Sequence, residues 1–297
     1  MKIKSETVEI NNKYSITLCI CTMNRPNELN RCLQSVFQGV KKPDEVIVSD
    51  DSPDNQATQQ VVAKYPGVIY QQGPRRGLGP NRNACIQRAR SSHIIFVDDD
   101  VCVPPEFFAT AHQLIAASDP KTLITGYEMK HCEGTQKIVP HNPDFWGLQR
   151  VPVRHEYRAI VINSTMFPRN LFEQALFDEH LRYGSEEIDI AQHAVALGYR
   201  IAYEDSLYVD HYPSPVNREQ YKQFVYASRL YATTKAYWYY ERSILKTLAF
   251  ILLAPLQLVG SAVRRRDTSA VWGAFQATVL AGQYLFSHFK MVKPKAV

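Results

Sequence analysis

The sequence lacks the glycine-rich motifs with which many nucleotide-binding folds hold phosphate. No G-x-x-x-x-G-K-[ST] motif occurs, and the pair Gly77-x-Gly79 has no third glycine and does not follow the first predicted strand. These glycines let backbone N–H groups approach the phosphates, so a P-loop or dinucleotide site is not expected. Any bound phosphate would instead be held by a metal ion and basic side chains.

The chain also lacks C-x-x-C pairs. Its six cysteines are Cys19, Cys21, Cys32, Cys85, Cys102 and Cys132. Cys19 and Cys21 lie two apart on a predicted strand and therefore point to one face. We interpret the cysteines as reduced packing residues rather than zinc ligands or disulfides. Residues 1–14 are polar and carry no secretory signal, so we expect catalysis to face the cytosol.

Acidic residues are scarce at the C-terminal end. From Arg242 onwards Asp267 is the single acid against eight basic residues, whereas the whole chain has a net charge of +5. The preceding part is therefore slightly acidic, with a net charge of −2. The basic character belongs to the tail, and a nucleic-acid partner for the main domain is not supported.

Strands and helices are predicted to alternate over the first hundred residues. Apolar runs predict strands over residues 15–21, 45–49, 68–70 and 93–97, and amphipathic patterns predict helices over residues 27–37, 55–65 and 80–90. Short crossover helices between buried strands are typical of a doubly wound α/β fold with a mostly parallel sheet. Ligands of such sheets bind beyond the carboxyl ends of the strands. Polar residues predicted to lie at that edge are Thr22, Asn24, Arg25, Asp50, Asp51, Asp98, Asp99 and Asp100.

The acidic triplet Asp98-Asp99-Asp100 is the most informative of these features. It follows the apolar run of residues 94–97 without a break. Three adjacent carboxylates repel one another, and a divalent cation, Mn2+ or Mg2+, would offset this charge and bind a diphosphate. Because side chains alternate along an extended segment, Asp98 and Asp100 are expected to face one way and Asp99 the other. The alternative interpretation is an acidic loop that caps the next helix.

Several segments in order resemble family 2 glycosyltransferases of the GT-A fold. Residues 16–26, 45–52, 77–84 and 96–104 resemble the nucleotide-binding half of these enzymes, and the similarity continues through residues 177–179 and 183–189. It covers roughly residues 14–212. The resemblance implies an inverting, metal-dependent transfer of a sugar from a nucleotide-sugar donor to a hydroxyl group.

The resemblance assigns the donor site by position. Thr22 and Asp51 match residues that contact the nucleoside, and Asp51 suits the pyrimidine of a UDP or dTDP sugar. Asp50 shares this task, Arg82 matches an arginine near the sugar nucleotide, and Asn24 and Arg25 follow the first strand at the same edge. The alternatives are a helix cap at Thr22, an Asx-turn at Asp50 or Asp51, and a solvated helix arginine at Arg82.

The metal site is also assigned by resemblance. Asp98 and Asp100 form the D-x-D pair, with Asp100 as the expected ligand of the cation. Asp98 is the second candidate ligand, and Asp98 or Asp99 would hold sugar hydroxyls. His211 is expected to complete the site, since a neutral imidazole suits Mn2+. The alternative for His211 is a hydrogen-bonded structural histidine.

The general base is expected near residue 187. The segment Gly184-Ser185-Glu186-Glu187-x-Asp189 differs from the family motif by one inserted position and by Glu in place of Asp. Alignment on Asp189 makes Glu187 the candidate base and Glu186 the second candidate. The same residues also make a good helix N-terminus, because carboxylates in the first turn complement the helix dipole.

Two regions are expected to serve the acceptor. Residues 130–157 form an irregular insertion, which is predicted to carry acceptor specificity. We divide the chain into a GT-A domain over residues 1–216, with a nucleotide-binding half (about 14–104) and an acceptor half (105–216), and a helical region over residues 217–297.

Two apolar segments in the helical region, residues 244–263 and 269–289, approach the length of a membrane span. Pro255 and several polar residues interrupt them, and basic residues flank them. Helices lying in the cytoplasmic membrane surface are therefore favoured over spans. A soluble helical hairpin or a dimer interface is the alternative. Membrane attachment would suit a lipid-linked or glycan acceptor, as in polysaccharide biosynthesis.

A second function class stays open. The altered motif at residues 184–189 also fits a catalytically silent protein that binds a nucleotide sugar or tethers partners to the membrane. A nucleotidyltransferase is disfavoured, because the glycine- and lysine-rich loop after its first strand is absent. The two main hypotheses differ in whether donor turnover follows donor binding.

Overall fold

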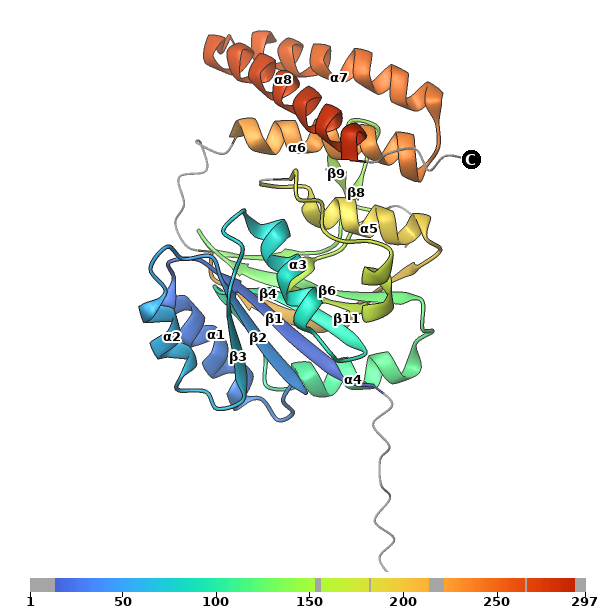
Figure 1. The fold of residues 1–297 in the computed structure, drawn as a ribbon. Coiled ribbons are helices and arrows are strands. Elements are labelled where there is room, and N and C mark those ends of the chain that lie inside the picture. Colours follow the sequence, from blue (N-terminus) through green and yellow to red (C-terminus); the bar gives the residue numbers. More distant parts are fainter. Residues whose placement is uncertain (1–13, 153–155, 182, 214–221, 265, 292–297) are drawn as a thin grey trace, which may run out of the picture.

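The computed structural model describes residues 14–152, 156–181, 183–213, 222–264 and 266–291. A mixed sheet lies at its centre with helices on both faces, and a layer of helices covers one end (Figure 1). The strand order is β3-β2-β1-β4-β10-β6-β11-β5, and β7 pairs with β6. The α/β fold with a mostly parallel sheet and C-terminal helices is confirmed.

The N-terminal half of the sheet is parallel. Its strands are β1 (Ile16–Thr22), β2 (Glu45–Asp50), β3 (Val68–Gln72) and β4 (His93–Asp98). Three helices connect them: α1 (Pro26–Gln38), α2 (Gln56–Val62) and α3 (Leu78–Arg88). β1 pairs in parallel with both β2 and β4, so the carboxyl ends of the three strands lie at one edge. Every predicted strand and helix of this half is present, with small shifts at its ends.

The second half of the sheet brings an antiparallel strand beside β4. β10 (Thr165–Pro168) runs antiparallel to β4 and to β6 (Thr122–His131), while β11 (Arg200–His211) runs parallel to β6. The end of β11 pairs with the short β5 (Val101–Cys102), which follows the acidic triplet. Helices α4 (Phe107–Ala117) and α5 (Glu186–Ala196) and the 3-10 helices η1 (Ile162–Ser164) and η2 (Arg169–Glu173) complete this half.

Alternation along β1 explains why both faces of the sheet are covered. Ile16, Leu18 and Ile20 enter a hydrophobic core with α1, α2 and α4, whereas Cys19 and Cys21 enter a second core with α3 and α5. A strand that is buried on both faces needs a largely apolar sequence, and residues 16–21 have one in which Thr17 is the single polar residue. The two cysteines share one face, as predicted.

The insertion at residues 130–157 is more regular than expected. It contains β7 (Thr135–Ile138), which extends the main sheet, and the small hairpin of β8 (Asn142–Pro143) and β9 (Gln149–Arg150). Residues 153–155 of the insertion lie outside the described residues. No alternation marked these strands in the sequence, because β7 is exposed and the hairpin is very short.

The C-terminal helices form a third core. α6 (Lys222–Lys235) continues as a π-helix, η4 (Ala236–Tyr240), and is followed by α7 (Ile244–Arg264) and α8 (Thr268–Met291). α7 and α8 lie over α6 at the end of the molecule (Figure 1). Both predicted apolar segments are therefore helices. The division at residue 216 falls among residues 214–221, outside the described residues, and stays a prediction.

Gly126 provides a test of the packing between β6 and β11. A Cβ at this position would lie 1.8 Å from the backbone oxygen of Leu207, beside a register shift between the two strands. We expect Gly126→Ala to lower the free energy of unfolding by roughly 1–3 kcal/mol, because the strands must separate. Denaturant unfolding measures the difference.

Gly273→Ala is the matched control, because a Cβ there meets nothing within 4 Å and Gly273 lies inside α8. Alanine in a helix interior should stabilise by about 0.5–1 kcal/mol. Equal effects of the two substitutions would contradict the close approach at Gly126.

Candidate functional site

The acidic triplet lies at a turn rather than on an extended segment. β4 ends at Asp98, and Asp99 and Asp100 form the turn before β5. Asp99 accepts a hydrogen bond of 2.7 Å from the Thr22 hydroxyl. One guanidinium nitrogen of Arg25 lies 3.0 Å from Asp99 and 3.2 Å from Asp100. The predicted opposite orientation of Asp99 and Asp100 is therefore wrong, because alternation holds only for extended backbone.

Asp98 has a different partner. Its carboxylate lies 3.3 Å from Arg82, whose side chain is buried and lies over the ring of Phe177. Arg82 is consequently not a solvated helix arginine. The positions of Arg25 and Arg82 spread two positive charges across the triplet, which lowers the repulsion among the three carboxylates.

Burial and the neighbouring charge of Arg25 shift the pKa of Asp99 in opposite directions. Burial raises the pKa of Asp99 to about 7, although the hydrogen bond from Thr22 and the charge of Arg25 act to lower it. The Thr22 hydroxyl is thus bonded to a carboxylate, not to a helix N-terminus.

The two aspartates after β2 differ in their contacts. Asp50 accepts hydrogen bonds from the backbone N–H and the hydroxyl of Ser52 and from the Tyr70 hydroxyl. These contacts form the Asx-turn that was the alternative interpretation for Asp50. Asn24, with a positive φ of 58°, donates its backbone N–H to the Ser52 hydroxyl at 2.8 Å.

Asp51 lies at the same edge as Thr22. Its backbone N–H donates to the Thr22 carbonyl at 2.9 Å, and its carboxylate accepts from the backbone N–H of Arg75 at 2.8 Å. Burial raises the pKa of Asp51, against the backbone hydrogen bonds. A Cβ at Gly73 would lie 2.2 Å from the Asp51 carboxylate, so a larger residue there would displace this side chain.

His211 contacts the acidic triplet from the end of β11. Because β11 pairs with β5, the ring of His211 reaches Asp100, with Nε2 at 3.3 Å from the carboxylate, while Nδ1 lies 3.1 Å from Glu128. Burial lowers the pKa of His211, but the hydrogen bonds to Asp100 and Glu128 outweigh it and raise the pKa to about 10. A protonated His211 therefore balances two carboxylates at neutral pH.

Sequence reasoning missed Glu128 and Asn163. Asn163 donates to Glu128 at 3.1 Å and accepts a hydrogen bond of 2.9 Å from the backbone N–H of Asp98. Both residues stand in segments without a recognisable motif, on β6 and η1. The one signal in the sequence is a carboxylate shortly after the apolar pair Leu123-Ile124.

Glu187 approaches the same edge from the start of α5. Gly184 and Ser185 have positive φ values of 83° and 70°, and this left-handed turn directs the chain into the helix. The Glu187 carboxylate accepts a hydrogen bond of 3.4 Å from the backbone N–H of Ile162. Burial, with the charges of Glu186 and Glu128, raises the pKa of Glu187 to about 7. Such a pKa suits a general base near neutral pH.

Glu186, the second candidate base, is also buried, and burial raises its pKa. Three carboxylates in the first turn of α5 fit the helix dipole, as predicted. Ser185 makes no side-chain hydrogen bond to the helix, so the cap expected there is incomplete.

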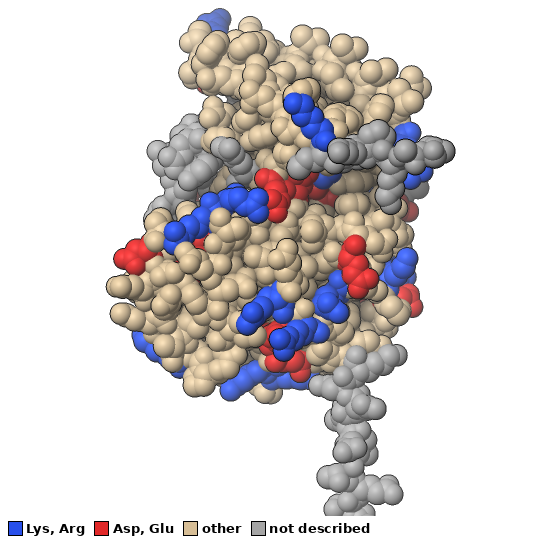
Figure 2. Space-filling model, in the orientation of Figure 1, with Lys and Arg blue, Asp and Glu red and all other residues tan. Residues whose placement is uncertain are grey.

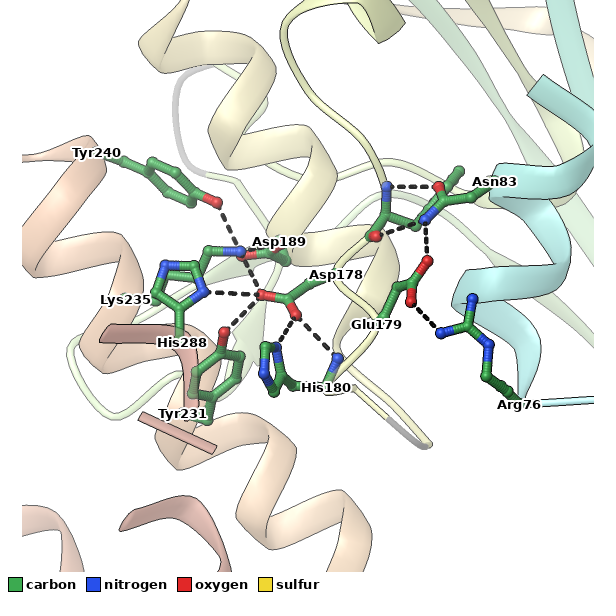
Figure 3. Close-up of polar contacts among 11 residues, drawn as sticks. Arg76, Asn83, Asp178, Glu179, His180, Asp189, Tyr231, Lys235, Tyr240 and His288 are labelled. Atoms are coloured by element: carbon green, nitrogen blue, oxygen red, sulfur yellow. Dashed lines mark hydrogen bonds and ion pairs between the residues drawn. The ribbon is translucent and has the colours of Figure 1, made fainter. Parts of the chain in front are cut away.

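A buried ion network joins α5 to the C-terminal helices (Figure 3). The Lys235 ammonium lies 2.6 Å from Asp178 and 2.9 Å from Asp189, and the Tyr231 and Tyr240 hydroxyls donate to the same two carboxylates. Burial acts to raise the pKa of Asp178, but His180 and Lys235 hold it well below its usual range. Asp189, two residues after Glu187, is thereby fixed against α6 and η4.

The same network includes a group with ligand atoms suited to a metal. Asp178, His180 and His288 offer such atoms within 4.8 Å of one another. The Lys235 ammonium already occupies the charge-neutralising position at Asp178. A second cation would be repelled there, so we interpret the group as an ion-pair network.

The donor set around the triplet also has the chemistry of a divalent-metal site, although its carboxylates are paired with Arg25 and Arg82. Carboxylate oxygens of Asp98 and Asp100 and the imidazole Nε2 of His211 combine oxygen and nitrogen ligands, a mixture that suits Mn2+. An α/β sheet of this kind places its ligand site beyond the carboxyl ends of its strands, where this acidic edge lies.

Comparison with known proteins assigns the family. The sequence model described as glycosyl transferase family 2 matches residues 17–177, which is more than half of the chain. The chain belongs to glycosyl transferase family 2, as its sequence motifs predicted.

Curated relatives match over part of their length. The chain is 25% identical over 118 residues to the amylovoran biosynthesis glycosyltransferase AmsE of Erwinia amylovora, covering 38% of this chain and 44% of AmsE. It is 22% identical over 180 residues to the glycosyltransferase GlyA of Streptococcus pneumoniae, covering 55% of this chain and 26% of GlyA. The chain thus spans less than half the length of these two relatives.

Solved structures share the fold. GalNAc-T7 with UDP, GalNAc and Mn2+ has a TM-score of 0.58 at 16% identity, covering 71% of this chain and 48% of GalNAc-T7. S. aureus TarS 1–349 has a TM-score of 0.56 at 15% identity, covering 92% of both chains. The mannosyltransferase PcManGT from Pyrobaculum calidifontis, in complex with GDP-Man and Mn2+, has a TM-score of 0.56 at 14% identity, covering 93% of this chain and 89% of PcManGT.

The raised pKa of Glu187 has a measurable effect on stability. The folded protein holds the proton of Glu187 more tightly than the unfolded chain does. The contribution of this proton to the free energy of unfolding is therefore complete below pH 4.5 and is lost as the pH rises through about 7. In EDTA, Glu187→Gln should match the native chain near pH 4.5 and exceed its free energy of unfolding above pH 8 by on the order of 2–3 kcal/mol. Denaturant unfolding across this range tests it, and a difference independent of pH would contradict the shift.

Proposed function

We propose that the protein is a metal-dependent inverting glycosyltransferase that transfers a sugar from a nucleotide-sugar donor to a hydroxyl group. The convergence of Asp98, Asp100, His211 and Glu187 at one edge of the sheet carries this proposal. In this proposal a cation at Asp98, Asp100 and His211 stabilises the leaving diphosphate. The Glu187 carboxylate, with a pKa near neutrality, takes the proton of the attacking hydroxyl.

The acceptor hydroxyl loses its proton to the Glu187 carboxylate as its oxygen forms a bond to the anomeric carbon of the donor. The bond between that carbon and the diphosphate oxygen breaks, and the electron pair leaves with the diphosphate. A divalent ion held by Asp100 and His211, with Asp98 as a further ligand, would neutralise charge on the leaving diphosphate. Glu186 is the second candidate for the base.

The proposed donor-binding residues lie at the same edge of the sheet. We assign the nucleoside to Asp51 and Thr22, which are joined by a backbone hydrogen bond, and Arg25 and Arg82 bring positive charge to the triplet. Asp50 and Asn24 shape the loop through Ser52. Asp99, whose two oxygens accept from Thr22 and Arg25, is proposed to contact a hydroxyl of the donor. We favour a UDP or dTDP sugar as the donor. Of the structural neighbours, GalNAc-T7 was solved with UDP and PcManGT with GDP-Man.

The acceptor is proposed to be a glycan or a lipid-linked glycan at the cytoplasmic face of the membrane. Among the described residues, α7 alone is long and apolar enough to cross a membrane. Its buried stripe packs inward through Phe250, Ala254 and Leu258, whereas Leu252 and Leu256 are 69% and 67% exposed.

The outer surface of α7 and α8 suits a bilayer interface. Trp272, Phe275 and Phe286 of α8 are also exposed, and this end of the molecule shows few charges (Figure 2). Arg242, Lys246 and Lys290 lie at the helix ends, where they can contact anionic lipid. We propose that the two helices lie in the membrane surface and hold the active site near a membrane-bound acceptor.

Nucleotide release from UDP-, dTDP- and GDP-sugars tests the catalytic proposal. We expect release to need Mn2+ or Mg2+, to stop in EDTA, and to fall by roughly 100-fold or more in Asp100→Asn and Glu187→Gln. Asp119→Asn is the matched control, because Asp119 is an exposed carboxylate paired with Arg200. Metal-dependent donor binding without release, even with membrane extract as acceptor, would support the catalytically silent protein instead.

Sedimentation with lipid vesicles tests the membrane proposal. Leu252→Glu/Leu256→Glu should weaken binding to vesicles of phosphatidylglycerol and phosphatidylcholine by at least about tenfold, because each leucine gains about 1.5–3 kcal/mol on burial. Val40→Glu is the control, since Val40 is equally exposed but lies after α1. Unchanged binding of the double variant would refute the role of this surface.

A further inference from the structure

We propose that Glu128 is a positioning residue that holds the His211 ring with Nε2 directed at the cation site beside Asp100. The inference rests on the proposed function, in which His211 is a metal ligand. Glu128 itself has no place in the family motifs of the sequence, and it reaches the site from the middle of β6.

A backbone N–H group sets the direction of the first hydrogen bond. The N–H of Asp98 can only donate, so the atom of Asn163 that lies 2.9 Å away must be the amide oxygen. The amide nitrogen of Asn163 therefore faces Glu128, with 3.1 Å to Oε2. Asn163 is 2% exposed, so water does not compete for this arrangement.

The second oxygen of Glu128 determines which nitrogen of His211 carries the proton. An ionised carboxylate only accepts hydrogen bonds, and Oε1 lies 3.1 Å from Nδ1 of His211. The proton on Nδ1 is consequently the one that His211 keeps when a cation takes the place of the proton on Nε2. A neutral ring in this tautomer has its lone pair on Nε2, which lies 3.3 Å from Asp100.

The contacts thus form a chain that begins and ends in the acidic triplet. It runs from the Asp98 backbone through Asn163, Glu128 and His211 to the Asp100 carboxylate. Both oxygens of Glu128 are engaged by protein donors, so Glu128 orients a ligand rather than serving as one. Partners of this kind typically change metal affinity by about 10–100-fold when they are removed.

The substitution Glu128→Gln tests the direction of the hydrogen bonds. Because the Asn163 nitrogen needs an acceptor, the new amide oxygen must face Asn163 and the new NH2 group must face His211. Nδ1 then becomes the acceptor and the proton moves to Nε2, where it blocks the cation site. The change is isosteric, so packing is preserved.

The compensating pair Glu128→Gln/Asn163→Asp should reverse this effect. The carboxylate introduced in place of the Asn163 amide accepts from the Asp98 N–H with one oxygen and from the new NH2 group with the other. The new amide oxygen at position 128 then faces Nδ1–H again, and the total charge equals that of the native pair. A purely structural role of Glu128 gives no reason for such rescue.

Mn2+ binding by the full chain without donor, followed by electron paramagnetic resonance of the free ion, measures the effect. Glu128→Gln should weaken Mn2+ binding by about 10–100-fold, and the compensating pair should recover most of the loss. In a His211→Ala background, Glu128→Gln should change the affinity by less than about twofold, because it acts through His211. Glu173→Gln, an exposed carboxylate on η2, is the control.

The outcomes separate the inference from the proposed function. If Asp100→Asn and His211→Ala leave Mn2+ binding unchanged, the proposed metal site is wrong. If both weaken binding but Glu128→Gln does not, or the compensating pair shows no recovery, the positioning role alone is overturned. Thermal unfolding of each variant confirms that a loss of affinity is measured on folded protein.

Discussion

Repulsion among closely placed carboxylates is the constraint on which the architecture of the site depends. Asp98, Asp99 and Asp100 meet Glu128 and Glu187 at one edge of the sheet, where burial raises the pKa of Asp99 and of Glu187. Three cationic side chains from three different segments offset this negative charge. Arg25 follows β1, Arg82 lies in α3, and His211 ends β11. The topology of the sheet is what brings these segments together.

The sequence predicted the parts of this arrangement that are local. Largely apolar runs predicted β1, β2 and β4, because strands buried on both faces need them. The polar residues that follow those runs lie at one edge, as expected from parallel pairing. The family motifs led to Glu187 and His211, which contact Ile162 and Asp100 at the same edge of the sheet.

Contacts between distant segments were beyond sequence reasoning. Glu128 and Asn163 are 35 residues apart and belong to no pattern, so their contact with His211 required the fold. The orientation of Asp99 was predicted wrongly because the strand ends at Asp98, two residues before the end of the segment over which alternation was assumed. No motif in the sequence includes Lys235, yet it is buried between Asp178 and Asp189. Its importance depends on burial, which a local pattern of charges does not reveal.

The exposed apolar side of α7 and α8 makes the state of the purified protein depend on its solvent. In water without lipid or detergent, the leucines of α7 and the aromatic residues of α8 can be removed from solvent only by contact with another molecule. Self-association would then grow with protein concentration by mass action. The particle size measured in dilute buffer, in detergent and on vesicles should therefore be regarded as three separate quantities, none of which alone defines a native stoichiometry.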